Sequence, residues 1–165
     1  MHFSLSLPTG SPWPAVSIGM CSDRARAEQD PCWRPLVARL QSLRKSGRRS
    51  VRIVDVNCGD GSLLIAATRE ARKLGFLAIE GSGVDPDADN IDDARRQARW
   101  LSDCAIGLEF ERATPMPSLL AEAEFPADII LYAPPPTYSK SFEDAVRASG
   151  QYVLAKREQC GMPSL

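Results

Sequence analysis

The sequence predicts an α/β domain built on a doubly wound, mostly parallel sheet. Strand and helix patterns alternate from residue 51 onward, which is the order of successive βαβ units. The first strand, VRIVDV at residues 51–56, is apolar without alternation, as in strands buried on both faces. A length of 165 residues suits one core, so we expect a single domain at residues 30–165 behind a flexible N-terminal arm at residues 1–29.

The first helix is expected to begin at Asp30, which can cap it, because Pro31 suits the first helical position and apolar residues recur at helical spacing. It should end at Gly47. A second helix at residues 62–74 places leucines and alanines on one face and charged residues on the other. Gly75 should end that helix.

The remaining elements follow the same alternation. A strand ending in GVD precedes a helix whose acidic residues crowd its start, where the helix dipole favours them. Ser141 and Asp144 form a predicted capping box for the last helix, which Gly150 ends. In order, we expect a strand ending at residues 83–85, a helix at 90–102, a strand at 106–112, a short helix at 119–123, a strand at 127–133, the capped helix and a strand at 151–155.

Composition limits the function. The 20 Lys and Arg residues balance 21 Asp and Glu residues, so no overall field favours nucleic acid or a membrane surface. No apolar run approaches the roughly 20 residues of a membrane span. Five cysteines without a CxxC pair argue against zinc or a disulfide framework, and the one histidine, His2, argues against a His-based triad. We expect no metal and a cytoplasmic location.

Two further features of the sequence bear on partners: a basic cluster and the C-terminal edge of the expected sheet. A basic cluster at residues 44–52, around the start of the first strand, makes nucleic acid possible but not favoured, because such runs are usually solvated helix ends. Its members are Arg44, Lys45, Arg48, Arg49 and Arg52. We expect the sheet to be shortened at its C-terminal edge, where an uncovered strand would favour a homo-oligomer.

A glycine turn follows the first strand in IVDVNCGDGSLL, residues 53–64. Ligands of doubly wound sheets bind outside the carboxyl ends of the strands, where the strand order reverses. Gly59 and Gly61 would let the backbone approach a ligand, and the amides that open the next helix suit a carboxylate or phosphate. The alternative interpretation is a tight turn that only needs left-handed backbone.

Asp85 ends the second strand, where a carboxylate can accept hydrogen bonds from ribose hydroxyls. Dinucleotides and adenosyl ligands both fit this arrangement of turn and acid. The dinucleotide fingerprint G-x-G-x-x-G, started at Gly59, requires a glycine where this chain has Leu64. NAD is therefore the second choice of ligand.

IVDVNCGDG resembles the first motif of class I S-adenosylmethionine-dependent methyltransferases, which share a Rossmann-like core. Asp55 takes the acidic position of that motif, Gly59 and Gly61 take its second and third glycines, and Asn57 stands where the first glycine is usual. Asn tolerates left-handed backbone better than most residues. GVDPD, with Asp85, resembles the second motif and ADIILYAPPPTY the fourth, so the likeness covers about residues 51–138.

This resemblance implies S-adenosylmethionine as cofactor, with its methionine part over the glycine turn, its ribose on Asp85 and its adenine flanked by Pro86 or Asp87. Thr114 would replace the acid that often holds the adenine amino group. The implied cofactor-binding residues are Asp55, Asn57, Cys58, Gly59, Asp60, Gly61, Asp85, Pro86 and Thr114. The implied substrate-binding residues are Ala133, Pro134, Pro135 and Tyr138.

We expect a methyltransferase acting on an unidentified, small acceptor, with no catalytic residue assigned. Ala133 stands where nitrogen-methylating relatives carry a polar residue, which disfavours methylation of a base or glutamine. The alternatives are an S-adenosylmethionine-binding module without turnover and, less favoured, an NAD-binding oxidoreductase. Cys58 is expected to be a small buried residue and not a nucleophile, because no histidine lies near it in the sequence.

Overall fold

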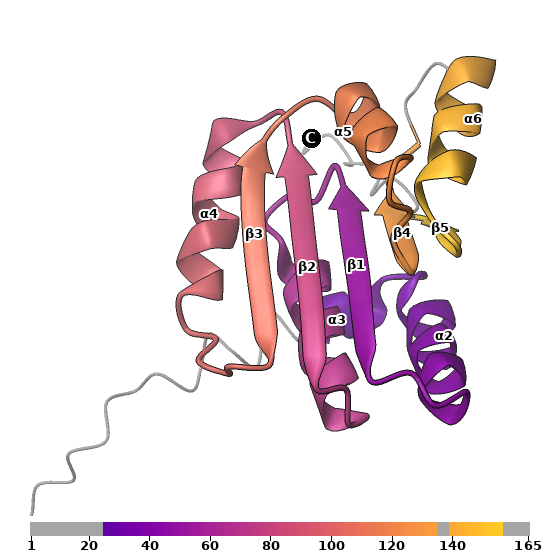
Figure 1. The fold of residues 1–165 in the computed structure, drawn as a ribbon. Coiled ribbons are helices and arrows are strands. Elements are labelled where there is room, and N and C mark those ends of the chain that lie inside the picture. Colours follow the sequence, from indigo (N-terminus) through magenta and orange to yellow (C-terminus); the bar gives the residue numbers. More distant parts are fainter. Residues whose placement is uncertain (1–24, 135–138, 157–165) are drawn as a thin grey trace, which may run out of the picture.

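A computed structural model describes residues 25–134 and 139–156 of the chain. Its centre is a five-stranded sheet with the order β3-β2-β1-β4-β5 (Figure 1). All four strand pairings are parallel, so the predicted doubly wound sheet is confirmed. The strands are β1 (Ser50–Val56), β2 (Ala78–Asp85), β3 (Ile106–Arg112), β4 (Ile129–Tyr132) and β5 (Val153–Ala155).

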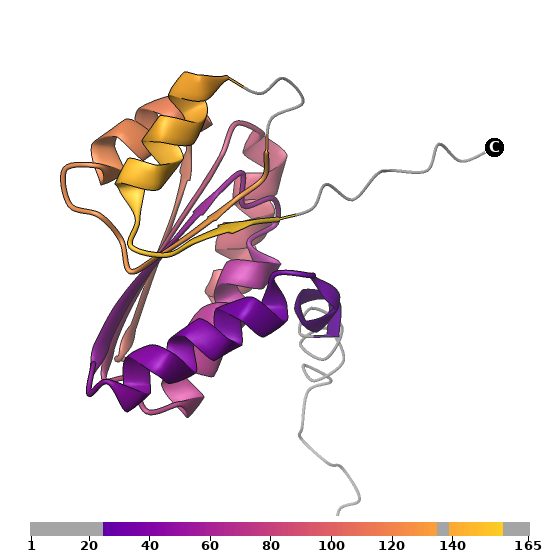
Figure 2. The ribbon, with the colours of Figure 1, turned by 90° about the vertical axis from the view of Figure 1, so that its right-hand side faces the viewer.

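Helices cover both faces of the sheet. Figure 2, which views the sheet on edge, shows helices packed against both of its faces. The first face carries α2 (Trp33–Lys45), α3 (Ser62–Lys73) and α4 (Ala88–Ala98). The second carries α5 (Pro115–Glu122) and α6 (Lys140–Ser149). Because both faces are covered, β1 is apolar nearly throughout, as its sequence predicts.

Each face of the sheet has its own hydrophobic core, and successive residues of β1 point alternately into one core and the other. Ile53 packs in the core beneath α2, α3 and α4, and Val54 packs in the core beneath α5 and α6. Each helix turns a stripe of apolar residues to its core; in α2 this stripe is Leu36, Leu40 and Leu43. This packing holds the strand ends in fixed places, which is what a binding site at the sheet edge requires.

Several helix boundaries differ from the predictions. α2 begins at Trp33 with Cys32 at its N-cap, and the Asp30 carboxylate accepts the amide of Cys32 in the turn just before the helix. α6 is capped by Ser139, whose hydroxyl accepts the amide of Phe142 at 3.3 Å; the predicted cap at Ser141 is wrong, since that residue lies within the helix. α5 begins earlier than predicted, with Pro115 in its first turn.

The N-terminal part of the described chain adds one more helical stretch at residues 25–29. Ala27, within that stretch, is buried in the core beneath α2, α3 and α4. Ordered structure therefore reaches into the last residues of the predicted arm. The rest of the predicted arm lies outside the described residues, and the predicted homo-oligomer stays a prediction.

Candidate functional site

The carboxyl edge of the sheet gathers the loops that the sequence singled out. The chain leaves β1 toward β2 and β3 on one side and returns to β4 and β5 on the other, so the strand order reverses beside β1. The arrowheads of β1, β2 and β3 in Figure 1 mark this edge. The Cys58 amide donates to the Val84 carbonyl at 2.9 Å, and the Ala133 amide donates to the Val56 carbonyl at 3.3 Å. These bonds join the loops after β1, β2 and β4.

The loop after β1 runs through a series of left-handed residues. Asn57 has φ 61°, Gly59 has φ 58° and Gly61 has φ 74°. Asn57 is the only residue other than glycine with positive φ in the described chain, so it adopts the left-handed backbone that asparagine tolerates better than most residues. The loop needs this series because it must turn sharply from β1 into α3.

The two glycines of the turn have different surroundings. A Cβ added to Gly61 would lie 2.7 Å from the ring of Phe110 and 2.8 Å from Ala94. Its missing side chain thus makes room for packing between α3, α4 and β3. A Cβ added to Gly59 would meet nothing within 4 Å. The face of Gly59 is therefore open, and this is the part of the turn where a ligand could approach the backbone.

Asp85 lies directly beside this turn. Its Oδ2 accepts the amide of Gly59 at 2.8 Å, which places the turn and the acid in one site as the sequence predicts. Its Oδ1 accepts the amide of Asp87 at 3.0 Å and the side-chain amide of Asn90 at 3.1 Å. Asp85 is only 5% exposed. The carboxylate is thus a structural anchor of two loops, a role that the sequence did not reveal.

Asp55, the acidic residue of the first motif, is fully buried. The ammonium of Lys156, which follows β5, donates to Asp55 Oδ1 and to the carbonyl of Asn57, the latter at 2.7 Å. Burial raises the pKa of Asp55 to about 6 even though Lys156 opposes the shift. Asp55 Oδ2 and Asn57 Oδ1 have no hydrogen-bond partner within the described residues.

Lys156 is the residue of this site that sequence reasoning missed. It stands 101 positions after Asp55, so no local motif connects the two. The signal that could have found it is topological: a lysine directly after a strand of a parallel sheet lies at the carboxyl edge. The backbone amide of Lys156 donates to the carbonyl of Tyr132 at 2.7 Å, which fixes the lysine beside the end of β4.

Cys58 is buried between Asp55 and β2. A Cβ on Gly83 would lie 3.1 Å from its sulfur, so the thiol fills the space that this glycine leaves. Burial raises the pKa of Cys58 well above its usual range, and Asp55 adds to this effect. Cys58 is therefore a small buried residue, as predicted, and its raised pKa disfavours the thiolate form.

Three other predicted cofactor residues lie around the turn and on the loops after β2 and β3. The Asp60 carboxylate accepts the amide of Ser62 at 3.1 Å and pairs with Arg26 at 2.9 Å, so it stabilises the start of α3. Pro86 is exposed just after β2. Thr114 is exposed at the N-cap of α5 and makes no side-chain capping bond. The amide of residue 113 donates to the Asp85 carbonyl at 3.1 Å, which brings the loop after β3 to the loop after β2.

The predicted substrate residues are described only in part. Ala133 and Pro134 are half-buried at the end of β4, where the Ala133 amide is bonded to β1. Pro135 and Tyr138 lie outside the described residues. Their contact with a substrate stays a prediction.

The basic cluster before β1 is largely engaged in contacts within the protein. Arg48 pairs with Asp128 at 2.8 Å, and Arg52 donates to Glu122 at 2.8 Å. Arg44 donates to the carbonyl of Leu74 at 3.2 Å. These arginines hold the loops at the amino edge of the sheet, which supports the structural interpretation of the cluster over a nucleic-acid surface.

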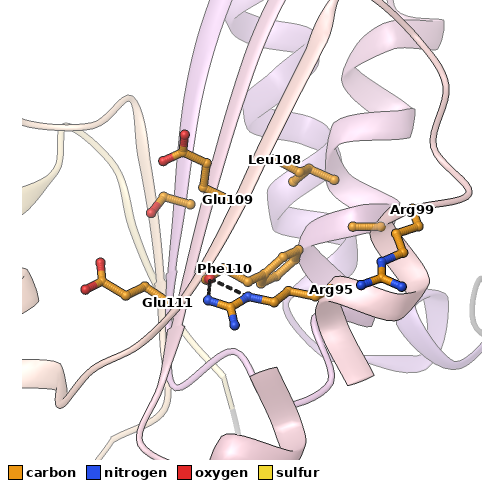
Figure 3. A pocket seen from close by; sticks show the side chains of 8 residues that line it. Arg95, Arg99, Leu108, Glu109, Phe110 and Glu111 are labelled. Carbon is orange, nitrogen blue, oxygen red and sulfur yellow. Dashed lines mark hydrogen bonds between the residues drawn. The ribbon is translucent and has the colours of Figure 1, made fainter. Parts of the chain in front are cut away.

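A cavity of about 600 Å³ lies along the outer strand β3 (Figure 3). The guanidinium groups of Arg95 and Arg99 lie on one side of it, and the carboxylates of Glu109 and Glu111 lie on the other. Arg95 donates twice to the carbonyl of Phe110, at 2.8 and 3.1 Å. Its lining is Ser82, Arg95, Ala98, Arg99, Leu108, Glu109, Phe110 and Glu111. None of the predicted site residues belongs to it. We do not assign the cofactor to this cavity, because mixed charges on an open sheet edge do not converge on one ligand group.

Residues 25–134 and 139–156 contain neither a metal-binding cluster nor a helix that could span a membrane. Among these residues, no group of three His, Cys, Asp or Glu side chains could hold a metal ion. In the same segments, no helix has the length and apolar content that crossing a membrane requires.

No protein-family model and no curated protein sequence matches the chain significantly. Solved structures do match. A provisionally assigned protein-L-isoaspartate O-methyltransferase from Plasmodium falciparum, solved with S-adenosyl-L-homocysteine, gives a TM-score of 0.52 at 12% identity over 96% of this chain and 66% of that chain. The provisionally assigned methyltransferase yhhF from Escherichia coli gives a TM-score of 0.50 at 17% identity, over 75% of this chain and 67% of that chain.

The chain spans a smaller share of other matches. It covers 32% of a provisionally assigned class I S-adenosylmethionine-dependent methyltransferase from Listeria monocytogenes, with 68% of this chain aligned at 22% identity and a TM-score of 0.48. The matches at 0.50 and above show that the fold is the Rossmann-like fold of methyltransferases. The predicted resemblance is therefore confirmed for the fold.

Proposed function

We propose that the carboxyl edge of β1 and β2 binds S-adenosylmethionine, and that the chain is a methyltransferase domain acting on an unidentified small acceptor. The observation that carries this proposal is the hydrogen bond from the Gly59 amide to Asp85 at 2.8 Å, beside the open face of Gly59. It joins the turn and the acid that an adenosyl ligand needs. The fold shared with methyltransferases supports the same assignment.

The residues present fit the polar groups of this cofactor. The buried acceptors of Asp55 and Asn57 suit the ammonium of its amino-acid end. Asp85 uses three hydrogen bonds of the roughly four that a carboxylate can accept. Since two of its donors are backbone amides, the side chain of Asn90 is the partner that could rotate away and yield its place to a ribose hydroxyl.

The chain's contribution to catalysis would be binding and orientation. The cofactor, when bound, supplies an electrophilic methyl group on its sulfonium. The turn after β1 would hold the amino-acid end and Asp85 the ribose, and the end of β4 would receive the acceptor. Ala133 offers only backbone groups there, which favours an acceptor that brings its own nucleophile and needs no side-chain base at this position.

Calorimetry on the full chain tests the binding step. We expect S-adenosylmethionine and S-adenosylhomocysteine to bind and NAD not to bind. Buried Leu64 lies where a dinucleotide site would need its third glycine, which is the reason for the second expectation. Binding of NAD alone would contradict the proposal in favour of an oxidoreductase.

Transfer is tested separately from binding. The chain is incubated with methyl-tritiated S-adenosylmethionine and a set of small-molecule extracts, and label is followed into products. We expect a labelled small molecule. A chain that binds the cofactor and labels nothing across such extracts would instead be a binding module without turnover.

A further inference from the structure

The side-chain ammonium group of Lys156 lies at the carboxyl edge of the sheet. Lys156 Nζ donates to the Asp55 carboxylate and to the carbonyl of Asn57. The side chain of Lys156 is 11% exposed and that of Asp55 is fully buried. A ligand can therefore pair with this carboxylate only if the side chain of Lys156 moves away from it.

The site around Lys156 has more hydrogen-bond acceptors than the lysine contacts. The side-chain oxygens of Asp55 and Asn57 that the ammonium does not contact have no hydrogen-bond partner within the described residues. Buried polar atoms are normally paired, so two orphaned acceptors beside one cation are a departure from the rule. Lys156 directs its ammonium to only two acceptors here, Asp55 Oδ1 and the carbonyl of Asn57. A primary ammonium group has three N–H donors, so one placed differently among these oxygens could satisfy an acceptor that Lys156 leaves unpaired.

We propose that Lys156 occupies the subsite for the α-ammonium group of the adenosyl amino acid, so that this end of the ligand binds by exchange with Lys156. The inference rests on the proposed function, since it concerns the same site. Both cations are primary ammonium groups that would donate to one buried carboxylate. In the exchange, the lysine regains its hydration at the surface while the ligand's ammonium loses its own.

The exchange makes Lys156 a determinant of ligand specificity. An adenosyl ligand with an amino-acid end must displace the lysine. The binding free energy that its ammonium gains at Asp55 is then offset by the loss of the ion pair between Lys156 and Asp55. A ligand without that end, such as 5′-methylthioadenosine, has no ammonium to place and leaves Lys156 where it is. The wild-type chain should therefore distinguish S-adenosylhomocysteine from 5′-methylthioadenosine only weakly.

Lysine acetylation of the wild-type chain tests this directly. Brief treatment with acetic anhydride, followed by mass spectrometry, reports the reactivity of each lysine with and without ligand. We expect saturating S-adenosylhomocysteine to increase the labelling of Lys156 several-fold, because the ammonium leaves its ion pair for solvent. The exposed lysines Lys45, Lys73 and Lys140 are internal references that should not change. 5′-Methylthioadenosine should leave Lys156 unchanged as well.

A variant supplies a second measurement. Lys156→Met keeps the aliphatic stem and removes the charge, so the ligand's ammonium no longer meets a competitor. Because hydrogen bonds to charged groups contribute about 1.5–3 kcal/mol, we expect the affinity ratio of S-adenosylhomocysteine to 5′-methylthioadenosine to rise by roughly tenfold or more. Lys156→Arg is the matched control, since it keeps a competing cation, and should leave the ratio near that of the wild type.

The outcomes separate this inference from the proposed function. If S-adenosylhomocysteine binds but the labelling of Lys156 stays the same or falls, the exchange is wrong while the binding site stands. A lower ligand ratio in Lys156→Met would also overturn it, because the lysine would then assist the amino-acid end. If neither adenosyl ligand binds the wild type, both proposals fail. Should Lys156→Met not fold, labelling of the wild type decides alone.

Discussion

The two buried carboxylates of the site, at the ends of β1 and β2, are held in different ways. Asp85 accepts three hydrogen bonds, two of them from backbone amides of loops that the fold itself fixes. Asp55 accepts a hydrogen bond from one flexible side chain, that of Lys156, and keeps an unpaired oxygen. The comparison teaches that neighbouring acids of one site can serve unlike purposes: Asp85 fixes the shape of the site, and Asp55 holds a partner that can be exchanged.

The largest expected effect comes from removing the fixed acid. Asp85→Ala would leave the amides of Gly59 and Asp87 and the Asn90 side chain without their charged acceptor in a partly buried place. With about 1–3 kcal/mol for each unsatisfied group, we expect the free energy of unfolding to fall by at least ~3 kcal/mol. Urea denaturation measures this loss.

Asp85→Asn is the control for that substitution. It keeps the shape of the side chain and one acceptor oxygen, so it should lose clearly less stability than Asp85→Ala. Equal stability of the wild type and Asp85→Ala would show that the three hydrogen bonds do not anchor the loops, and would remove the contrast between the two acids.

The next effect is the pH dependence of stability that Asp55 contributes. Its pKa is about 6 in the folded chain against an ordinary 3.8, so the folded state binds the proton more tightly than the unfolded state. The contribution is therefore fully present below pH 3.8 and is lost as pH rises through about 6. A pKa of about 6 in the folded chain against 3.8 in the unfolded chain corresponds to roughly 3 kcal/mol of stability across this window.

Asp55→Asn isolates this contribution, because the other carboxylates titrate in both proteins. Urea denaturation of both proteins between pH 3.5 and pH 8, in steps of about half a unit, supplies the difference curve. We expect the wild type to lose stability relative to Asp55→Asn as pH rises through that window. A difference curve that is flat, or that slopes the other way, would mean that Lys156 compensates the burial of Asp55 completely.

The two glycines of the turn give a smaller, paired effect. Gly61→Ala puts a Cβ 2.7 Å from Phe110 in left-handed backbone, so we expect a loss of about 2–3 kcal/mol of stability. Gly59→Ala meets nothing within 4 Å and should cost about 1 kcal/mol, from backbone strain alone. For ligand affinity the order should reverse, because only Gly59 faces open space. Thermal denaturation and calorimetry on the same samples compare the two variants.

The smallest effect is expected at Thr114. It stands at the N-cap of α5 but makes no capping hydrogen bond with its side chain, so Thr114→Ala should change stability by less than about 0.5 kcal/mol. If the threonine holds the adenine, the variant should bind S-adenosylhomocysteine more weakly with its stability unchanged. A clear loss of stability would instead assign Thr114 to the structure of α5.

The sequence predicted the parts of this molecule that depend on local pattern. The apolar run of β1 and the acid ending β2 predicted a parallel sheet with both features at its carboxyl edge, and the structure joins them through Gly59 and Asp85. Left-handed backbone at Asn57 also followed from residue type. These predictions succeeded because each depends on a few adjacent residues.

The predictions that failed or were never made concern contacts between distant segments. The pairing of Lys156 with Asp55 and the packing of Gly61 against Phe110 join elements that no local motif connects. The donors on Asp85 come from loops whose approach only the folded sheet determines. The cap at Ser139 was missed for a different reason, because Ser141 offered an equally good local signal and the choice depends on where the chain enters α6.

Backbone amide NMR with S-adenosylhomocysteine tests the central claim most directly. Titration into the 15N-labelled chain should shift the amide signals of Gly59, Asp85 and Asp87 and the side-chain signal of Asn90, and leave those of Arg99 and Leu108, at the cavity along β3, in place. Shifts confined to that cavity, or no shifts at saturating ligand, would contradict the account.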